Sequence, residues 1–153
     1  NKKDEQWYIN TNQSFAFADG KITASYGSAT AKAHADTLFT AQDETDGLGT
    51  EGEVKTRGLK YNLIQNVKKQ ANSLLLKTDW YVTRKSEKST AIPSNITTWR
   101  NGIRSKQAAM ETSITNANDT PALETLYTYV NTADEGDPKV MERPIGEFPE
   151  LGS

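Results

Sequence analysis

The sequence predicts an α+β protein, in which a small N-terminal β-hairpin module precedes a three- to four-helix module and an extended C-terminal tail. Hydrophobic residues alternate in the first part of the chain and recur every three to four positions in the second, which are the periods of strands and amphipathic helices. An acidic, glycine-rich stretch separates the two patterns. The predicted division is therefore a β-rich module at 1–41, a linker at 42–56, a helical module at 57–132 and a tail at 133–153.

The β-rich module is predicted from a hairpin signal at Asp19-Gly20. A two-residue type I′ turn needs positive φ at both central positions, which Asp and Gly tolerate. The resulting register places four apolar side chains on one face of the hairpin: Phe15, Phe17, Ile22 and Ala24. An isolated hairpin is marginal in water, so we expect this face to pack on the Trp7-Tyr8-Ile9 segment, on the helices or on another chain.

The linker at 42–56 contains five acidic residues and three glycines. Its Asp43-Glu44-Thr45-Asp46-Gly47 run faintly suggests a calcium loop, but the spacing differs from that of an EF-hand and no Glu closes it. We therefore interpret this segment as an acidic turn and predict no metal site.

The helical module begins with an amphipathic stretch of about twenty residues from Arg57. Thr78 is predicted to be the N-cap of a second, short helix, and Asp79 in its first turn complements the helix dipole. Trp80 is expected to anchor this helix on the next.

A longer helix is predicted to begin at Pro93 or Ser94. Its apolar stripe has helical spacing: Ile96, Trp99, Ile103, Gln107, Met110 and Ile114. A final helix follows, with Thr120 as the predicted N-cap and Pro121 at the first helical position.

The tail at 133–153 is acidic and rich in glycine and proline, so we expect it to be extended. Phe148 and Leu151 would be unusual as solvated tail residues, and we expect them to dock on a partner or on the helices.

The net charge of −2 conceals a strong segregation. Residues 1–56 carry five Lys and nine acids, residues 57–106 carry eleven Lys or Arg and two acids, and residues 107–153 carry two basic residues and nine acids. The three segments have net charges of −4, +9 and −7. Such asymmetry indicates interaction rather than a particular fold. The low apolar content, 35% without glycine, indicates a subunit whose core and charge pairing are completed by neighbours.

The residue inventory does not favour an enzyme. The chain has no cysteine, and its single histidine, His34, lies in a stretch without a nucleophile elbow. No phosphate-binding glycine motif is present, so we predict no catalytic residue, no cofactor and no metal. No apolar run is long enough to span a membrane.

The basic helical segment raises the alternative of nucleic-acid binding, because Trp80, Tyr81 and Trp99 are interleaved with its Lys and Arg residues. Trp99, however, lies on the apolar helical stripe, and acidic segments flank the basic one. We therefore favour acidic protein segments over nucleic acid as the partner of this surface.

An ordered pattern in the helical module resembles a small helical domain of tailed bacteriophages, known as the tail assembly chaperone or tail-fibre assembly family. The pattern lies within residues 63–104 and consists of Leu74-Leu75, Thr78-Asp79-Trp80, Arg84, Glu87, Ile92-Pro93, Trp99-Arg100 and Arg104. Residues 144–151 look like the proline- and aromatic-containing tails of such proteins. The resemblance covers about half of the chain and does not include the hairpin module.

The resemblance implies a non-enzymatic bacteriophage tail structural protein, in the tail, the baseplate or the tail-fibre attachment, which acts through protein–protein interfaces. Its partners would be other tail, baseplate or fibre proteins and further copies of itself. It would be made in the host cytoplasm and be located in the virion. The alternatives are an assembly chaperone absent from the mature virion and a nucleic-acid-binding protein. The candidate interface residues are Arg84, Arg100, Arg104, Phe148 and Leu151, whereas Thr78, Asp79 and Pro93 are expected to be structural.

Overall fold

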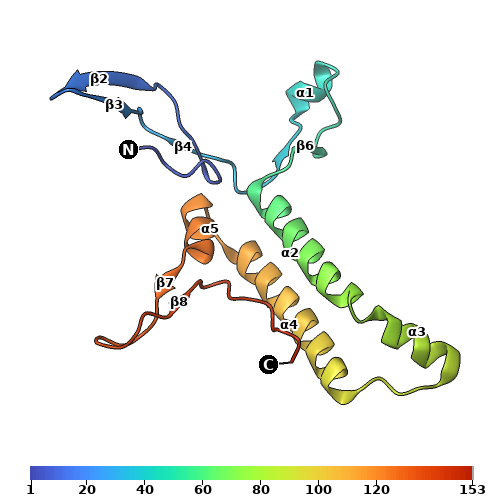
Figure 1. Ribbon diagram of the computed structural model, residues 1–153. Helices are drawn as coiled ribbons and strands as arrows, with labels where there is room; N and C mark the ends of the chain where they lie inside the picture. The colour runs from blue at the N-terminus through green and yellow to red at the C-terminus, as the bar shows by residue number, and fades with distance from the viewer. Residues whose placement is uncertain (153) are drawn as a thin grey trace. The chain divides into compact units, whose positions relative to one another are not determined.

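The protein is α+β, as the sequence predicts; the computed structural model describes residues 1–152 (Figure 1). The helices are α1 (Ala41–Thr45), α2 (Leu59–Leu76), α3 (Asp79–Lys88), α4 (Ser94–Asn116) and α5 (Thr120–Tyr127). The strands are β1 (Tyr8–Ile9), β2 (Ser14–Ala18), β3 (Lys21–Ser25), β4 (Thr30–Ala31), β5 (Thr37–Leu38), β6 (Val54–Thr56), β7 (Val130–Asn131) and β8 (Met141–Glu142).

The described chain forms two compact units. The hairpin unit comprises Asn1–Leu59 together with Asn118–Glu124, and the helical unit comprises Lys60–Ala117 together with the chain from Thr125 onward. The sequence expectation ended the β-rich module at residue 41 and treated 42–56 as a linker. In the structure, residues 42–56 contain most of α1 and all of β6 and lie inside the hairpin unit.

The β2–β3 hairpin has the predicted register. Ala18 pairs with Lys21, and Phe17 pairs with Ile22. The turn residues Asp19 and Gly20 have φ values of 50° and 73°, as a type I′ turn requires. The Asp19-Gly20 signal therefore predicted the register of this hairpin correctly.

The remaining strands of the hairpin unit also pair two by two, β1 with β4 and β5 with β6. A capping box begins α1, because the Thr40 side chain accepts a hydrogen bond from the Asp43 amide while the Asp43 carboxylate accepts one from the Thr40 amide. Lys55 on β6 forms an ion pair with Asp43 at 2.5 Å. Two residues within the segment expected to be a linker, Asp43 and Lys55, therefore pair with each other.

The buried residues of the hairpin unit come from both of its chain segments. Trp7 and Tyr8 are buried, as are Thr120 and Leu123 of α5. The Tyr8 hydroxyl donates a hydrogen bond of 2.8 Å to Glu124, which raises the pKa of the Tyr8 phenol. The predicted N-cap of α5 was displaced by one residue, since the Asp119 carboxylate accepts the cap hydrogen bond from the Ala122 amide. The Thr120 hydroxyl instead donates to the Lys32 carbonyl at 2.6 Å.

The helical unit is built on α2 and α4, which lie side by side (Figure 1). Ala71 of α2 packs against Trp99 and Ile103 of α4. The predicted stripe of α4 is buried at five of its six positions: Ile96, Trp99, Ile103, Met110 and Ile114. Gln107, the polar member, is partly exposed.

The segment predicted to be an extended tail is folded in the structure. Residues 130–142 form the β7–β8 hairpin, in which Val130 pairs with Glu142. Ile145 is buried, and its amide donates to the Leu126 carbonyl at 3.0 Å. The Trp99 indole donates to the Pro149 carbonyl at 2.8 Å, which attaches the end of the chain to α4. Within residues 1–152, no helix has both the length and the apolar character needed to cross a membrane.

Candidate interaction surfaces

Arg100 is used inside the helical unit. Its guanidinium Nη1 lies 2.9 Å from the Leu75 carbonyl, 2.7 Å from the Thr78 hydroxyl and 2.8 Å from the Asp79 carboxylate. The positively charged guanidinium thus donates to a free carbonyl at the C-terminal end of α2, where the helix dipole favours a cation. It also connects that end of α2 to the Asp79 carboxylate in the first turn of α3. The Arg100 side chain is only 9% exposed, so it is not available to clamp a partner's carboxylate.

Thr78 occupies the N-cap position of α3, but its side chain makes no cap hydrogen bond. The Thr78 hydroxyl instead donates to the Leu75 carbonyl and accepts from Arg100. The predicted capping role of this side chain was therefore wrong, because the buried guanidinium is a stronger partner for the hydroxyl than a helix amide.

Arg84 lies on α3 together with two aromatic residues. Its guanidinium carbon is 4.8 Å from the centre of the Trp80 ring and 5.2 Å from that of Tyr81, and the two rings are 3.8 Å apart. Trp80 is 52% exposed, so it does not anchor α3 in the interior as expected. The arrangement instead groups the exposed Trp80 with the half-buried Tyr81 and Arg84, and these residue types are enriched in binding hot spots.

Arg104 is exposed on α4 and makes one long hydrogen bond of 3.5 Å to Asn101. It lies beside a shallow surface groove lined by Leu75 of α2 and by Gln107 and Glu111 of α4. Arg104 is thus accessible to a partner, unlike Arg100 one turn earlier.

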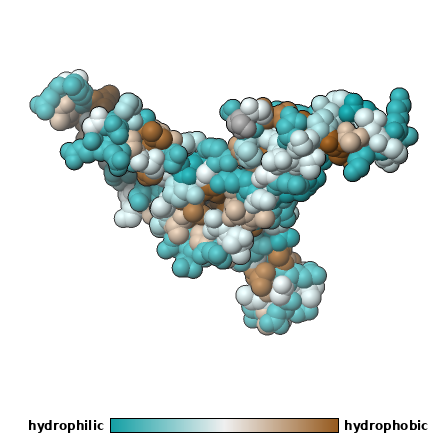
Figure 2. Space-filling view, turned by 90° about the horizontal axis from the view of Figure 1, so that it is seen from below, coloured by the Kyte–Doolittle hydropathy of each residue, from teal (hydrophilic) through white to brown (hydrophobic). Residues whose placement is uncertain are grey.

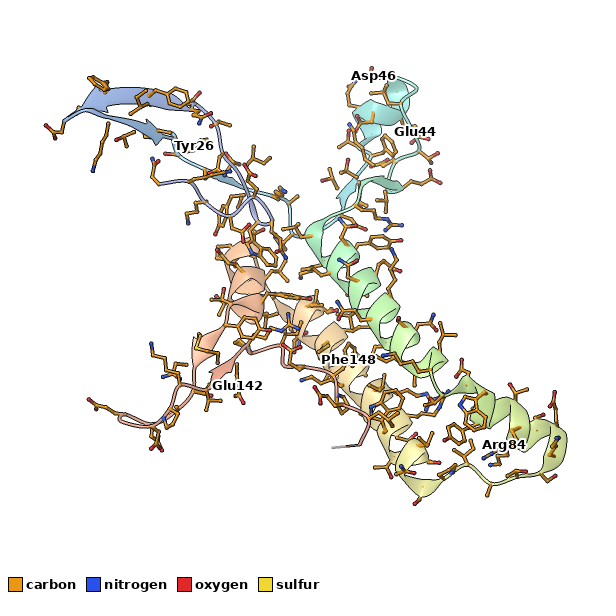
Figure 3. The ribbon with its side chains drawn as sticks, viewed as in Figure 1. Tyr26, Glu44, Asp46, Arg84, Glu142 and Phe148 are labelled. Atoms are coloured by element: carbon orange, nitrogen blue, oxygen red, sulfur yellow. The ribbon has the colours of Figure 1, made fainter. Side chains whose placement is uncertain are left out.

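Phe148 and Leu151 have different environments. Phe148 packs against the Ala71, Trp99 and Ile103 cluster, and Figure 3 shows its side chain beside α4. Of the two expected locations, a partner or the helices, Phe148 therefore docks on the helices of its own chain. Leu151 is half-exposed at the rim of a depression beside Trp99.

An ion pair fixes the turn after β8. Arg143 donates to the Glu147 carboxylate at 2.7 Å, and the Tyr129 hydroxyl donates to the same carboxylate at 2.9 Å. The Arg143 hydrogen bond, followed by that of Tyr129, lowers the pKa of Glu147 against the opposing effect of burial. Because Gly146 has a φ of 72°, the turn between the two partners adopts a conformation that glycine tolerates. This cluster adds local contacts to the folded C-terminal segment.

The β2–β3 hairpin presents an uncovered apolar face. All ten of its strand residues are exposed, and Phe15, Phe17 and Ile22 have 68%, 74% and 73% of their surfaces accessible. Figure 2 shows hydrophobic residues as separate groups among hydrophilic ones on the face in view. Of the three coverings expected for the hairpin face, neither the Trp7–Ile9 segment nor the helices bury it in residues 1–152.

An acidic loop, which we define as residues 42–53, is a second exposed feature of the hairpin unit. Asp43 is engaged by Lys55 and Thr40, which together lower the pKa of its carboxyl to about 2. The other acids of the loop form no ion pair with a Lys or Arg of the described chain: Glu44, Asp46, Glu51 and Glu53. Leu48 at its tip is 61% exposed. Figure 3 labels Glu44 on α1 and Asp46 immediately after it.

No group of three or more His, Cys, Asp or Glu side chains in residues 1–152 is arranged to hold a metal ion. Comparison of the chain with protein-family models, with curated proteins and with solved structures found no match.

The sequence contains local signals for two further features, the burial of Arg100 and the capping box at Thr40. Arg100 follows Ile96 by four residues and precedes Ile103 by three, so its helical position already lay on the buried stripe. Thr40 precedes Asp43 by three residues, which is the spacing of a capping box. No comparable local signal distinguished the exposed Trp80 from a buried one.

Proposed function

We propose that this chain is a non-enzymatic structural protein of a bacteriophage tail, a component of the tail, the baseplate or the tail-fibre attachment. It would be made in the host cytoplasm and incorporated into the virion in several copies. The residue pattern in 63–104 supports the phage assignment, and the uncovered face of the β2–β3 hairpin supports action through protein–protein interfaces.

The hairpin face carries the interface part of the proposal. A two-stranded hairpin whose apolar residues stay in water gains little from folding, and three or more strands or a packed helix are normally needed. Three large side chains aligned on one face become useful when another protein covers them. A partner that adds a sheet or helix to this face would complete the hairpin as a folded element.

Three members of the phage-like pattern are structural in this chain. Thr78, Asp79 and Arg100 meet in one hydrogen-bonded cluster at the junction of α2, α3 and α4. Residues with that role fix how the helices join, and their side chains are already engaged with one another. Under the proposal, partner choice therefore belongs to exposed elements such as the hairpin face.

Mass spectrometry of purified virions tests the proposal. We expect the chain at a fixed, multiple copy number relative to known tail proteins. Presence in infected cells together with absence from purified particles would overturn the structural role and leave the assembly chaperone as the explanation.

Variants of the hairpin test the interface. Phe15→Thr, Phe17→Thr and Ile22→Thr together keep strand propensity but remove the apolar face. We expect unchanged helical circular dichroism and loss of incorporation into particles. Ala16→Thr with Ala18→Thr, on the opposite face of the same hairpin, is the matched control and should incorporate normally. Normal incorporation of the triple variant would remove the hairpin face from the proposal.

A further inference from the structure

We infer that α3 is a docking surface for the acidic loop, residues 42–53, of a second copy of this chain. The inference rests on the proposed function only in that a multi-copy tail protein needs contacts between its copies. It identifies one such contact, between the exposed loop residues and a face of α3 on which Trp80, Lys85 and Lys88 are exposed and Tyr81 and Arg84 are half-buried.

The α3 half is one helical face. Because successive residues of an α-helix are rotated by about 100°, five side chains of α3 fall within an arc of about 140°: Trp80, Tyr81, Arg84, Lys85 and Lys88. Glu87 at the edge of this arc leaves a net charge of +2. Lys85 and Lys88 are exposed, and none of the three basic side chains forms an ion pair in the described chain. Figure 3 shows Arg84 on this helix.

The loop half matches this face in charge and in apolar content. The loop holds four carboxylates that form no ion pair in the described chain, two of which accept hydrogen bonds within the loop, and it also holds Leu48, which is 61% exposed. An acidic loop with one aliphatic side chain complements an aromatic surface bordered by Arg and Lys, since the leucine can contact the Trp80 ring while the carboxylates meet the cations. The cations of α3 and these carboxylates of the loop form no ion pair within residues 1–152 of one chain, and under the inference they pair with each other between two copies.

The connection between the two halves favours a second copy over the same chain. In the chain, β6 connects the acidic loop to the N-terminal end of α2, and α3 follows the C-terminal end of that helix. Helix α2 has 18 residues, so the two attachment points are about 27 Å apart. Each copy therefore offers one donor loop and one acceptor helix, which is a heterologous contact that builds rings or open chains.

Sedimentation of the purified full-length chain over a range of concentrations tests the inference. We expect reversible association at low salt, and weaker association in ~1 M salt, where charges are screened beyond about 3 Å. A chain that stays monomeric at every concentration and salt would overturn the inference. It would leave the proposed function standing, because virion mass spectrometry reports on that function separately.

Charge reversal identifies the surfaces. Arg84→Glu with Lys85→Glu should weaken association at least about tenfold, and Glu51→Lys with Glu53→Lys should do the same from the other side. The matched control is Lys21→Glu with Lys139→Glu, which changes the net charge as much as the α3 reversal but at exposed lysines elsewhere. Association that is unchanged by the α3 and loop reversals, or equally weakened by the control, would contradict the inference.

Recombining the two reversals separates a lost contact from a damaged fold. A chain that carries both the α3 and the loop reversals has its charges exchanged and should associate again, within about tenfold of the original affinity. Failure of this combined variant to recover, with helical circular dichroism intact, would overturn the inference. Trp80→Ala should also weaken association, whereas Leu76→Ala, an exposed apolar residue on α2, should not.

Discussion

Ile103 on α4 and Ile22 on β3 are the same residue type in opposite situations. Ile103 is fully buried where α4 packs against α2 and the C-terminal segment, whereas 73% of the Ile22 surface is accessible. The helical unit covers its apolar stripe with its own residues, including Phe148 from more than forty residues further along the chain. The hairpin unit leaves the β2–β3 face uncovered. The comparison teaches that the helical unit buries its apolar stripe with its own residues, whereas the hairpin unit keeps an apolar face exposed, which we propose a partner covers.

The largest expected effect is the loss of Arg100. Arg100→Ala takes the donor away from the Leu75 carbonyl and the Thr78 hydroxyl, and at about 1–3 kcal/mol for each buried group it should lower the free energy of unfolding of the helical unit by about 2–6 kcal/mol. Urea denaturation followed by helical circular dichroism measures this. Arg104→Ala, one turn later on the same helix, is the control and should change stability by less than about 0.5 kcal/mol. Similar losses for the two variants would mean that Arg100 does not tie the helices together.

The next largest effect on stability is expected at Ile103, and comparing it with Ile22 tests the difference between the two units. Ile103→Ala should cost about 2–5 kcal/mol, because it leaves a cavity in a packed interior. Ile22→Ala should change the stability of the free chain by no more than about 0.5 kcal/mol. A large loss from Ile22→Ala in the free chain would show that the hairpin face is covered there, and the comparison between units would fail.

A smaller effect is expected at the beginning of α5. Asp119→Ala removes the side-chain cap on the Ala122 amide and should destabilise the hairpin unit by about 1 kcal/mol. Thermal unfolding monitored by tryptophan fluorescence, with Trp7 as the reporter in this unit, measures it. Asn118→Ala, at the neighbouring exposed position, should be neutral, and equal effects of the two variants would assign the cap elsewhere.

The smallest expected effect is the pH dependence of α1. Lys55 and Thr40 lower the pKa of Asp43 from 3.8 to about 2 in the folded chain. A carboxyl whose folded pKa is depressed stabilises the fold above its unfolded pKa, and this contribution is lost as the pH falls from about 4 to about 2. An NMR titration of Asp43 measures the midpoint, and Lys55→Gln should raise it. A midpoint near 4 in the unmodified chain would contradict the capping arrangement.

The parts of this fold that local patterns specify were predictable. The Asp19-Gly20 turn determined the register of β2 and β3, and helical spacing identified the buried residues of α4. The C-terminal segment was not predictable as a folded element, because its attachment depends on contacts such as Trp99 with Pro149, fifty residues apart. A single sequence contains no local record of such long-range pairs.

The candidate site was predictable only in part. The sequence identified arginines with interface potential but treated Arg84, Arg100 and Arg104 alike. The structure separates them by burial: Arg100 is enclosed by acceptors from α2 and α3, whereas Arg84 stacks on exposed rings and Arg104 reaches into solvent. Of the three, only Arg100 has partners outside its own helix within residues 1–152, and the sequence contains no local signal for such partners.

Hydrogen–deuterium exchange of the chain, free in solution and within purified phage particles, tests the central claim most directly. We predict fast exchange of the β2–β3 amides in the free chain and strong protection in the particle, with α4 protected equally in both. Protection of the hairpin in the free chain, or fast exchange of the hairpin inside the particle, would contradict the claim that this face is completed by a partner in the assembled tail.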